Sequence, residues 1–84
     1  MPTITFDQAR KFGIPKKSLQ TIEIPLTYSL IQSIDWLTKN GYKHNTMRKT
    51  KNFRRFRQER DIAGATYYSK KLPNGIVLVW QNYR

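Results

Sequence analysis

Residues 66–82, TYYSKKLPNGIVLVWQN, predict a β-hairpin. The turn lies at residues 72–76, LPNGI, where proline fixes φ at the turn entry and Asn-Gly supplies residues that tolerate positive φ. It joins a strand over about residues 66–71 to a second over about residues 76–82. The second strand is apolar at both alternating positions, so we expect it in the middle of the sheet, covered by a helix on one face and partly covered on the other.

An amphipathic helix is expected over about residues 28–39. Its apolar side chains recur three or four positions apart and form one stripe, which is typical of a helix that packs on a core. Thr27 is the predicted N-cap, and Asn40-Gly41 ends the helix. The apolar stripe consists of Leu30, Ile31, Ile34 and Leu37, and the residues expected to face away from it are Gln32, Ser33 and Asp35.

A shorter helix is expected near the N-terminus, over residues 4–13. Thr5 followed three residues later by Gln8 matches a capping box, in which each side chain bonds to the other's backbone N–H. Gly13 suits the left-handed conformation that ends many helices. After it, residues 20–24 alternate apolar and polar side chains, several of them β-branched, and this pattern predicts a short strand.

Residues 6–22, FDQARKFGIPKKSLQTI, resemble the two-helix core of helix-turn-helix DNA-binding segments. The resemblance rests on Ala9, on the turn residue Gly13 four positions later, and on apolar Leu19 and Ile22 at the spacing of the second helix. It covers about a fifth of the chain and implies a second helix in place of the strand. The groove-facing residues of that helix would be Lys16, Lys17, Ser18 and Gln20.

Two structures are open for residues 42–60. Phe53 and Phe56 are three positions apart, which is a helical spacing, whereas alternation as a strand would place Arg54 and Phe56 on one face. We favour a strand because the neighbouring hairpin needs a third strand for stability, with a turn at residues 50–52 before it. An arginine-rich helix is the alternative.

Together these elements predict a single α+β domain over residues 1–84, with the main helix packed on a short antiparallel sheet. A chain of 84 residues that is 38% hydrophobic has room for one modest core. It has no cysteine, so no disulfide or thiolate metal site is available. No apolar run reaches the roughly 18 residues of a membrane helix, and we expect an intracellular protein with no membrane partner.

Positive charge is concentrated in the middle of the chain. The net charge is +11, and residues 39–60 hold nine basic residues against Glu59 alone, which gives this segment +8. Like charges at this density repel and weaken the folded state unless a partner offsets them. A folded, strongly basic domain is typical of proteins that bind a polyanion.

The sequence offers little for catalysis. Its five carboxylates are scattered, and His44 is the only histidine, so neither a two-metal site nor paired imidazole chemistry is expected. The common phosphate-loop and nucleophile-elbow motifs are absent from the sequence. We therefore expect no enzymatic activity, no cofactor and no metal.

Nucleic-acid binding, to DNA or RNA, fits the basic residues better. Arginines hold phosphate oxygens with two parallel hydrogen bonds, lysines act as point charges, and tyrosines stack on bases. We expect the tyrosine-bearing strand to lie beside the arginine-rich strand, so that basic and aromatic side chains interleave. The predicted binding residues are Lys43, Arg48, Lys49, Lys51, Arg54, Arg55, Arg57, Arg60, Tyr67, Tyr68, Lys70 and Lys71.

A second hypothesis is a small interaction or inhibitor module that presents its basic face to an acidic groove of a nucleic-acid-processing enzyme. Composition does not separate the two hypotheses. Small size with dense charge is typical of accessory proteins of viruses and mobile elements, and of chromosome- or ribosome-associated factors.

Overall fold

The computed structural model describes residues 3–83, which form a small α+β domain. The predicted fold class is confirmed. In chain order the elements are α1 (Phe6–Lys11), β1 (Lys17–Pro25), α2 (Leu30–Lys39), β2 (Met47–Lys49), β3 (Phe53–Arg57), β4 (Thr66–Lys71) and β5 (Val77–Asn82).

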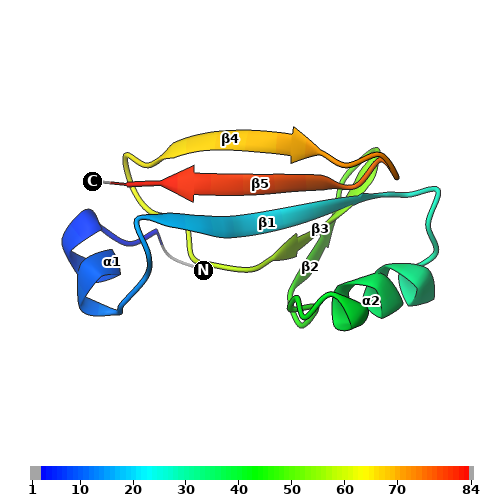
Figure 1. Ribbon diagram of the computed structural model, residues 1–84, viewed down its shortest axis with the longest axis horizontal. Coiled ribbons are helices and arrows are strands. Elements are labelled where there is room, and N and C mark those ends of the chain that lie inside the picture. The colour runs from blue at the N-terminus through cyan, green and yellow to red at the C-terminus, as the bar shows by residue number, and fades with distance from the viewer. Residues whose placement is uncertain (1–2, 84) are drawn as a thin grey trace.

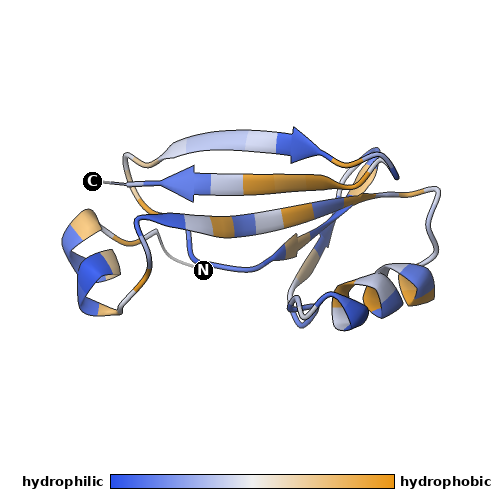
Figure 2. Cartoon of the chain, viewed as in Figure 1, coloured by the Kyte–Doolittle hydropathy of each residue, from blue (hydrophilic) through white to orange (hydrophobic). Residues whose placement is uncertain are grey.

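The strands form one antiparallel sheet in the order β2-β3-β1-β5-β4 (Figure 1). The middle strand is β1, so the prediction that the strand over residues 76–82 lies at the centre is wrong by one position. Figure 2 shows why β5 was expected there: its first half is continuously apolar, whereas β1 alternates. Polar residues such as Thr21 and Glu23 on one side of β1 give the central strand the pattern of a half-buried one.

The N-terminal helix forms as predicted. Thr5 caps α1 with Gln8 in a capping box, and Gly13 has φ of +75° just after the helix. The helix-turn-helix expectation is wrong, because the segment of the second helix is the start of β1. Pro15 favours an extended residue before it, and β-branched Thr21 and Ile22 favour the strand that follows.

The main helix begins two residues later than predicted. Ser29, not Thr27, is its N-cap, and forms a capping box with Gln32. Thr27 lies inside a turn closed by the Tyr28 N–H, which donates to the Pro25 carbonyl at 3.0 Å. A residue held in that turn is too early in the chain to cap the helix.

The buried side of α2 also differs from the predicted stripe. Leu37 is buried as expected, but Ser33 is buried too, while Ile31 is 81% exposed and Leu30 42% exposed. The Ser33 hydroxyl donates to the Ser29 carbonyl at 2.8 Å, so this buried hydroxyl has a hydrogen-bond partner.

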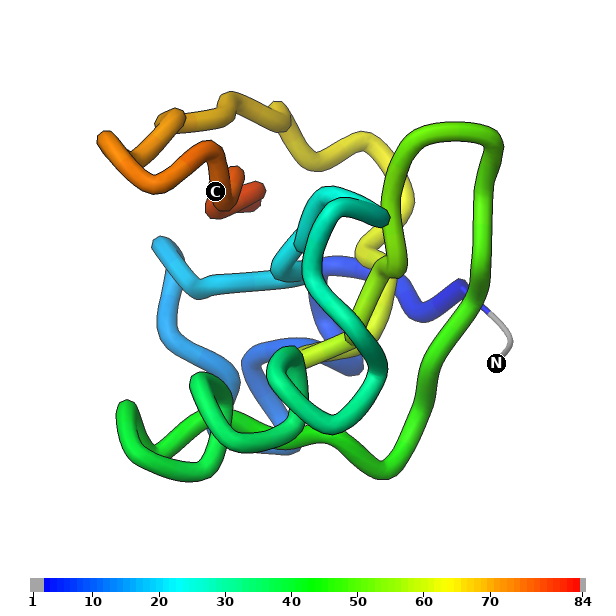
Figure 3. Tube along the Cα trace, turned by 90° about the vertical axis from the view of Figure 1, so that its right-hand side faces the viewer, coloured from blue at the N-terminus to red at the C-terminus, as the bar shows by residue number. Residues whose placement is uncertain are grey.

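Residues 42–60 contain strands and no helix, as favoured. The β2–β3 hairpin turns at Thr50, whose N–H donates to the Phe53 carbonyl at 2.8 Å. Viewed from the α2 end (Figure 3), the chain after α2 runs out to one side before it returns to the sheet. This hairpin lies at the opposite edge of the sheet from β4.

The two faces of the sheet differ. The α2 face carries the main core, in which Ile22, Phe56 and Leu78 pack with Leu37 of the helix. The open face carries the alternate residues, such as Thr21, Arg57 and Val79. A second buried cluster joins α1 to the chain around Ile62 and Tyr83; it consists of Ile4, Ala9, Ile14, Ile62 and Tyr83. Of the helices in residues 3–83, none has the length and apolar character needed to cross a membrane.

Candidate nucleic-acid interface

Side chains on the open face form rows that cross the sheet. Strand register places cations at both ends of the first row, one carboxylate between them and a valine near the centre. From β2 to β4, this row consists of Arg48, Arg55, Glu23, Val77 and Lys71. The next row, from β3 to β4, consists of Arg57, Thr21, Val79 and Ser69.

The β2–β3 hairpin places like charges directly opposite one another on both faces. Arg48 is the register partner of Arg55 on the open face, and Lys49 is the partner of Arg54 on the α2 face. Directly opposed residues have Cβ atoms only about 5 Å apart, and like charges at that separation weaken the sheet. An anion bound between them would offset the repulsion.

Three arginines of β3 contact groups of the protein itself. Arg54 Nη1 donates to the Tyr28 carbonyl at 2.5 Å, and Arg57 Nη2 lies 3.5 Å from Asp61 Oδ2. Arg55 Nε lies 3.2 Å from Glu23 Oε2, but this buried nitrogen makes no hydrogen bond, so the pair is held by charge without an aligned N–H. The contacts of Arg55 and Arg57 fix where their guanidinium groups lie on the open face.

A pocket of about 340 Å³ opens on the open face beside Arg48, Arg55 and Arg57. Three guanidinium groups and one carboxylate line it, which leaves a net charge of +2. Arg48, at the edge, is exposed and has no ion pair or side-chain hydrogen bond to the rest of residues 3–83. The lining residues are Gln20, Thr21, Thr46, Arg48, Arg55, Arg57 and Asp61.

A second pocket of about 230 Å³ adjoins the first through the shared residues Thr46 and Arg57. The second pocket extends from the first toward the loop before β2 and toward the segment after β3. Its other lining residues are Lys43, Asn45, Gln58, Glu59 and Arg60.

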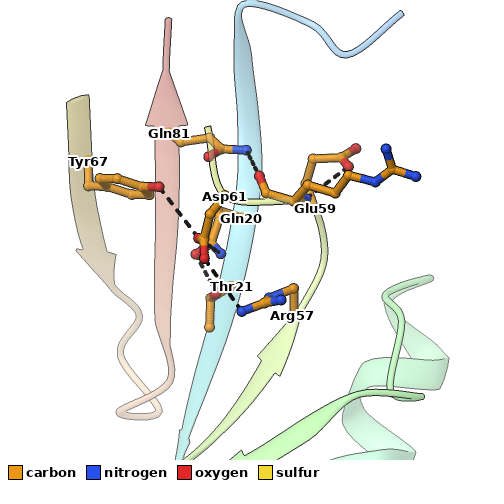
Figure 4. Close-up of polar contacts among 8 residues, drawn as sticks. Gln20, Thr21, Arg57, Glu59, Asp61, Tyr67 and Gln81 are labelled. Carbon is orange, nitrogen blue, oxygen red and sulfur yellow. Dashed lines mark hydrogen bonds and ion pairs between the residues drawn. The ribbon is translucent and has the colours of Figure 1, made fainter. Parts of the chain in front are cut away.

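Asp61 lines the first pocket and also forms a hydrogen bond with Tyr67 of β4 (Figure 4). Its carboxylate accepts from Gln20 Nε2 at 2.6 Å and from the Tyr67 hydroxyl at 3.5 Å, and Gln20 in turn accepts from the Thr21 hydroxyl. Burial raises the pKa of Tyr67 above its usual value of 10.0, and the charge of Asp61 raises it further. Tyr67 is therefore a hydrogen-bond donor at neutral pH.

The predicted binding residues divide between the two faces of the sheet and the loops. The open face holds Arg48, Arg55, Arg57, Tyr67 and Lys71. The α2 face holds Lys49, Arg54, Tyr68 and Lys70. The segments outside the strands hold Lys43, Lys51 and Arg60.

The expectation that the arginine-rich and tyrosine-rich strands are neighbours is wrong. Between β3 and β4 lie both β1 and β5. Three strand spacings amount to about 14 Å, too far for their side chains to interleave. Because β1 pairs with both β3 and β5, the strands β3 and β4 are kept apart. The sequence of neighbouring residues does not indicate this long-range pairing.

Two residues beside Tyr68 are missing from the predicted binding residues of the sheet, and one of them, Lys17, was named only as a groove-facing residue of the helix-turn-helix resemblance. Lys17 Nζ lies 5.5 Å from the Tyr68 ring centroid and 5.6 Å from that of Trp80. Trp80 is the register partner of Tyr68. Counting outward from the Asn74-Gly75 turn would have given this pairing, because turn position fixes hairpin register. Lys17 could not be found this way, since it lies on a different strand.

Comparisons with known protein families, curated proteins and solved structures found no match. Within residues 3–83, no three histidine, cysteine, aspartate or glutamate side chains are grouped so that they could hold a metal ion.

Proposed function

We propose that this protein is a non-enzymatic nucleic-acid-binding protein that holds backbone phosphates on the open face of its sheet. The observation that carries the proposal is the pocket of about 340 Å³ lined by Arg48, Arg55 and Arg57. We place its action inside the cell, in the setting of an accessory protein of a virus or mobile element that the small, densely charged chain suggests.

The geometry supports a phosphate as the ligand. Guanidinium groups form paired hydrogen bonds with phosphate oxygens, and a phosphate between Arg48 and Arg55 would neutralise the repulsion built into their register. Arg55 and Arg57 are already oriented by Glu23 and Asp61, so binding would order little more than the exposed side chain of Arg48.

The pocket also limits how the ligand is held. A volume of about 340 Å³ accommodates a phosphate with its sugar but not a double helix. The floor is polar, with Thr21 and Gln20, and no hydrophobic residue is among those that line the pocket. Contact with the backbone of a nucleic acid therefore fits better than insertion of a peptide anchor.

The test is a fluorescence-anisotropy titration with duplex DNA, single-stranded DNA and RNA at about 150 mM salt. Replacing Arg48 by Gln should weaken binding several-fold and reduce the slope of log K against log salt by about 1. Lys49→Gln is the matched control, because it removes the same charge from the next residue of β2 on the other face.

We expect Lys49→Gln to change affinity by less than about twofold. Equal losses for both variants would reject the pocket as the binding site. Absence of binding to all three nucleic acids would reject the function itself and would leave an acidic protein surface as the partner.

A further inference from the structure

Tyr68 and Trp80 lie opposite one another on neighbouring strands of the α2 face. They are register partners on β4 and β5, and Tyr68 is 41% exposed. Trp80 is partly buried against the main core, so its ring is fixed by packing. The helix α2 lies near the other end of β1 (Figure 1), and all six residues of β4 are exposed.

Basic side chains flank the pair. Lys17 Nζ lies within 5.6 Å of both ring centroids, and Lys70 lies two residues after Tyr68 on the same face of β4. Fixed aromatic rings beside cations are the combination by which proteins hold single-stranded nucleic acids: bases stack on the rings while cations follow the backbone.

We propose that Tyr68 and Trp80 are a stacking site for an unpaired nucleobase, with Lys17 and Lys70 contacting the phosphates on either side of it. This rests on the proposed function and narrows its substrate to single-stranded nucleic acid. In a duplex the base faces are covered by neighbouring bases, so a sheet surface reaches them only when the strand is unpaired.

Lys17 has a definite part in this site. In the unbound protein its ammonium group occupies the space over both rings, in cation–π contact. An arriving base takes that space, and the long side chain swings to the adjacent phosphate, so the charge is never left without a partner.

The test uses tryptophan fluorescence. Trp36, the other tryptophan, is stacked on Tyr42 at 5.7 Å and belongs to α2, so Trp36→Phe leaves Trp80 as the only reporter. Titration with oligothymidylate of about ten nucleotides should quench Trp80, and a blunt-ended DNA duplex should not. Anisotropy of a labelled oligonucleotide with the unmodified chain gives the same affinities without the Trp36 change.

Tyr68→Ala should weaken oligothymidylate binding about tenfold and leave any binding of the blunt-ended duplex unchanged. Ile31→Ala is the control: it removes an apolar side chain, 81% exposed, from α2, outside both proposed sites. Quenching of Trp80 should persist in it.

Saturated binding without quenching, or full affinity in Tyr68→Ala, would overturn the stacking site and leave the arginine pocket standing. Failure of the protein to bind any nucleic acid would overturn both.

Discussion

Glu23 and Asp61 are the carboxylates that face the arginines of the open face. Glu23 lies 3.2 Å from Arg55 and Asp61 lies 3.5 Å from Arg57. Each carboxylate orients the guanidinium group that it pairs with, which prepares the site for a ligand. Each also cancels part of that guanidinium's charge, which weakens the attraction of the site for an anion. These ion pairs are partly exposed, and their contribution to stability is about 0–1 kcal/mol.

Replacing Glu23 by Gln should therefore strengthen nucleic-acid binding. Removing one negative charge beside Arg55 frees that arginine for a phosphate, so we expect affinity at about 150 mM salt to rise a few-fold and the salt dependence to steepen. Anisotropy titration at several salt concentrations measures both.

Asp35→Asn provides the control for Glu23→Gln. It removes the same charge from α2, where Asp35 pairs with Lys39 at 2.9 Å and does not line the arginine pocket. A gain as large in Asp35→Asn as in Glu23→Gln would mean that net charge, not the pocket, sets affinity. No gain in Glu23→Gln would contradict the role given to Arg55.

Among the elements, those specified by neighbouring residues could be predicted from the sequence. The β4–β5 hairpin follows from its Pro-Asn-Gly turn, and the capping box of α1 from Thr5 and Gln8. The division of the β3 arginines between two faces also follows, because strand alternation puts Arg54 with Phe56 and away from Arg55 and Arg57. The strand order and the buried face of α2 could not be predicted. The strand order depends on β1 pairing with strands far along the chain, and a register change of one residue reverses which side chains share a face.

The start of α2 gives a prediction about this local chemistry. Ser29→Ala removes the side chain that accepts from the Gln32 N–H at 3.1 Å, and should lower the free energy of unfolding by about 1 kcal/mol. Thr27→Ala, two residues earlier, should have little effect. Urea unfolding monitored by circular dichroism checks both; a larger loss at Thr27 would restore it as the cap.

The candidate site was predictable in composition and not in arrangement. Arginine and lysine in the middle third of the sequence marked the region, and three of those arginines line one pocket. Arg54 lies on the other face and binds the Tyr28 carbonyl, and Trp80, which belongs to an apolar strand, was not among the predicted binding residues. Residue type indicates what a side chain can bind, whereas the sheet decides which side chains act together.

For the whole molecule, the basic side chains of the strands lie on both faces of the sheet. The arginine pocket opens on one face near β2 and β3, and the Tyr68–Trp80 pair lies on the other face at β4 and β5. Lys70 and Lys71 point to opposite faces of edge strand β4, so this edge is basic on both sides. A single-stranded nucleic acid that contacts both sites would pass around the β4 edge of the sheet.

The most direct test of the phosphate-binding face is nuclear magnetic resonance observation of the arginine side chains during titration with a short single-stranded oligonucleotide at about 150 mM salt. The Nε–Hε signals of Arg48, Arg55 and Arg57 should shift together as the protein saturates. The signal of Arg10, paired with Asp7 on α1, should stay in place. A saturated complex in which the three pocket arginines do not shift would contradict the account.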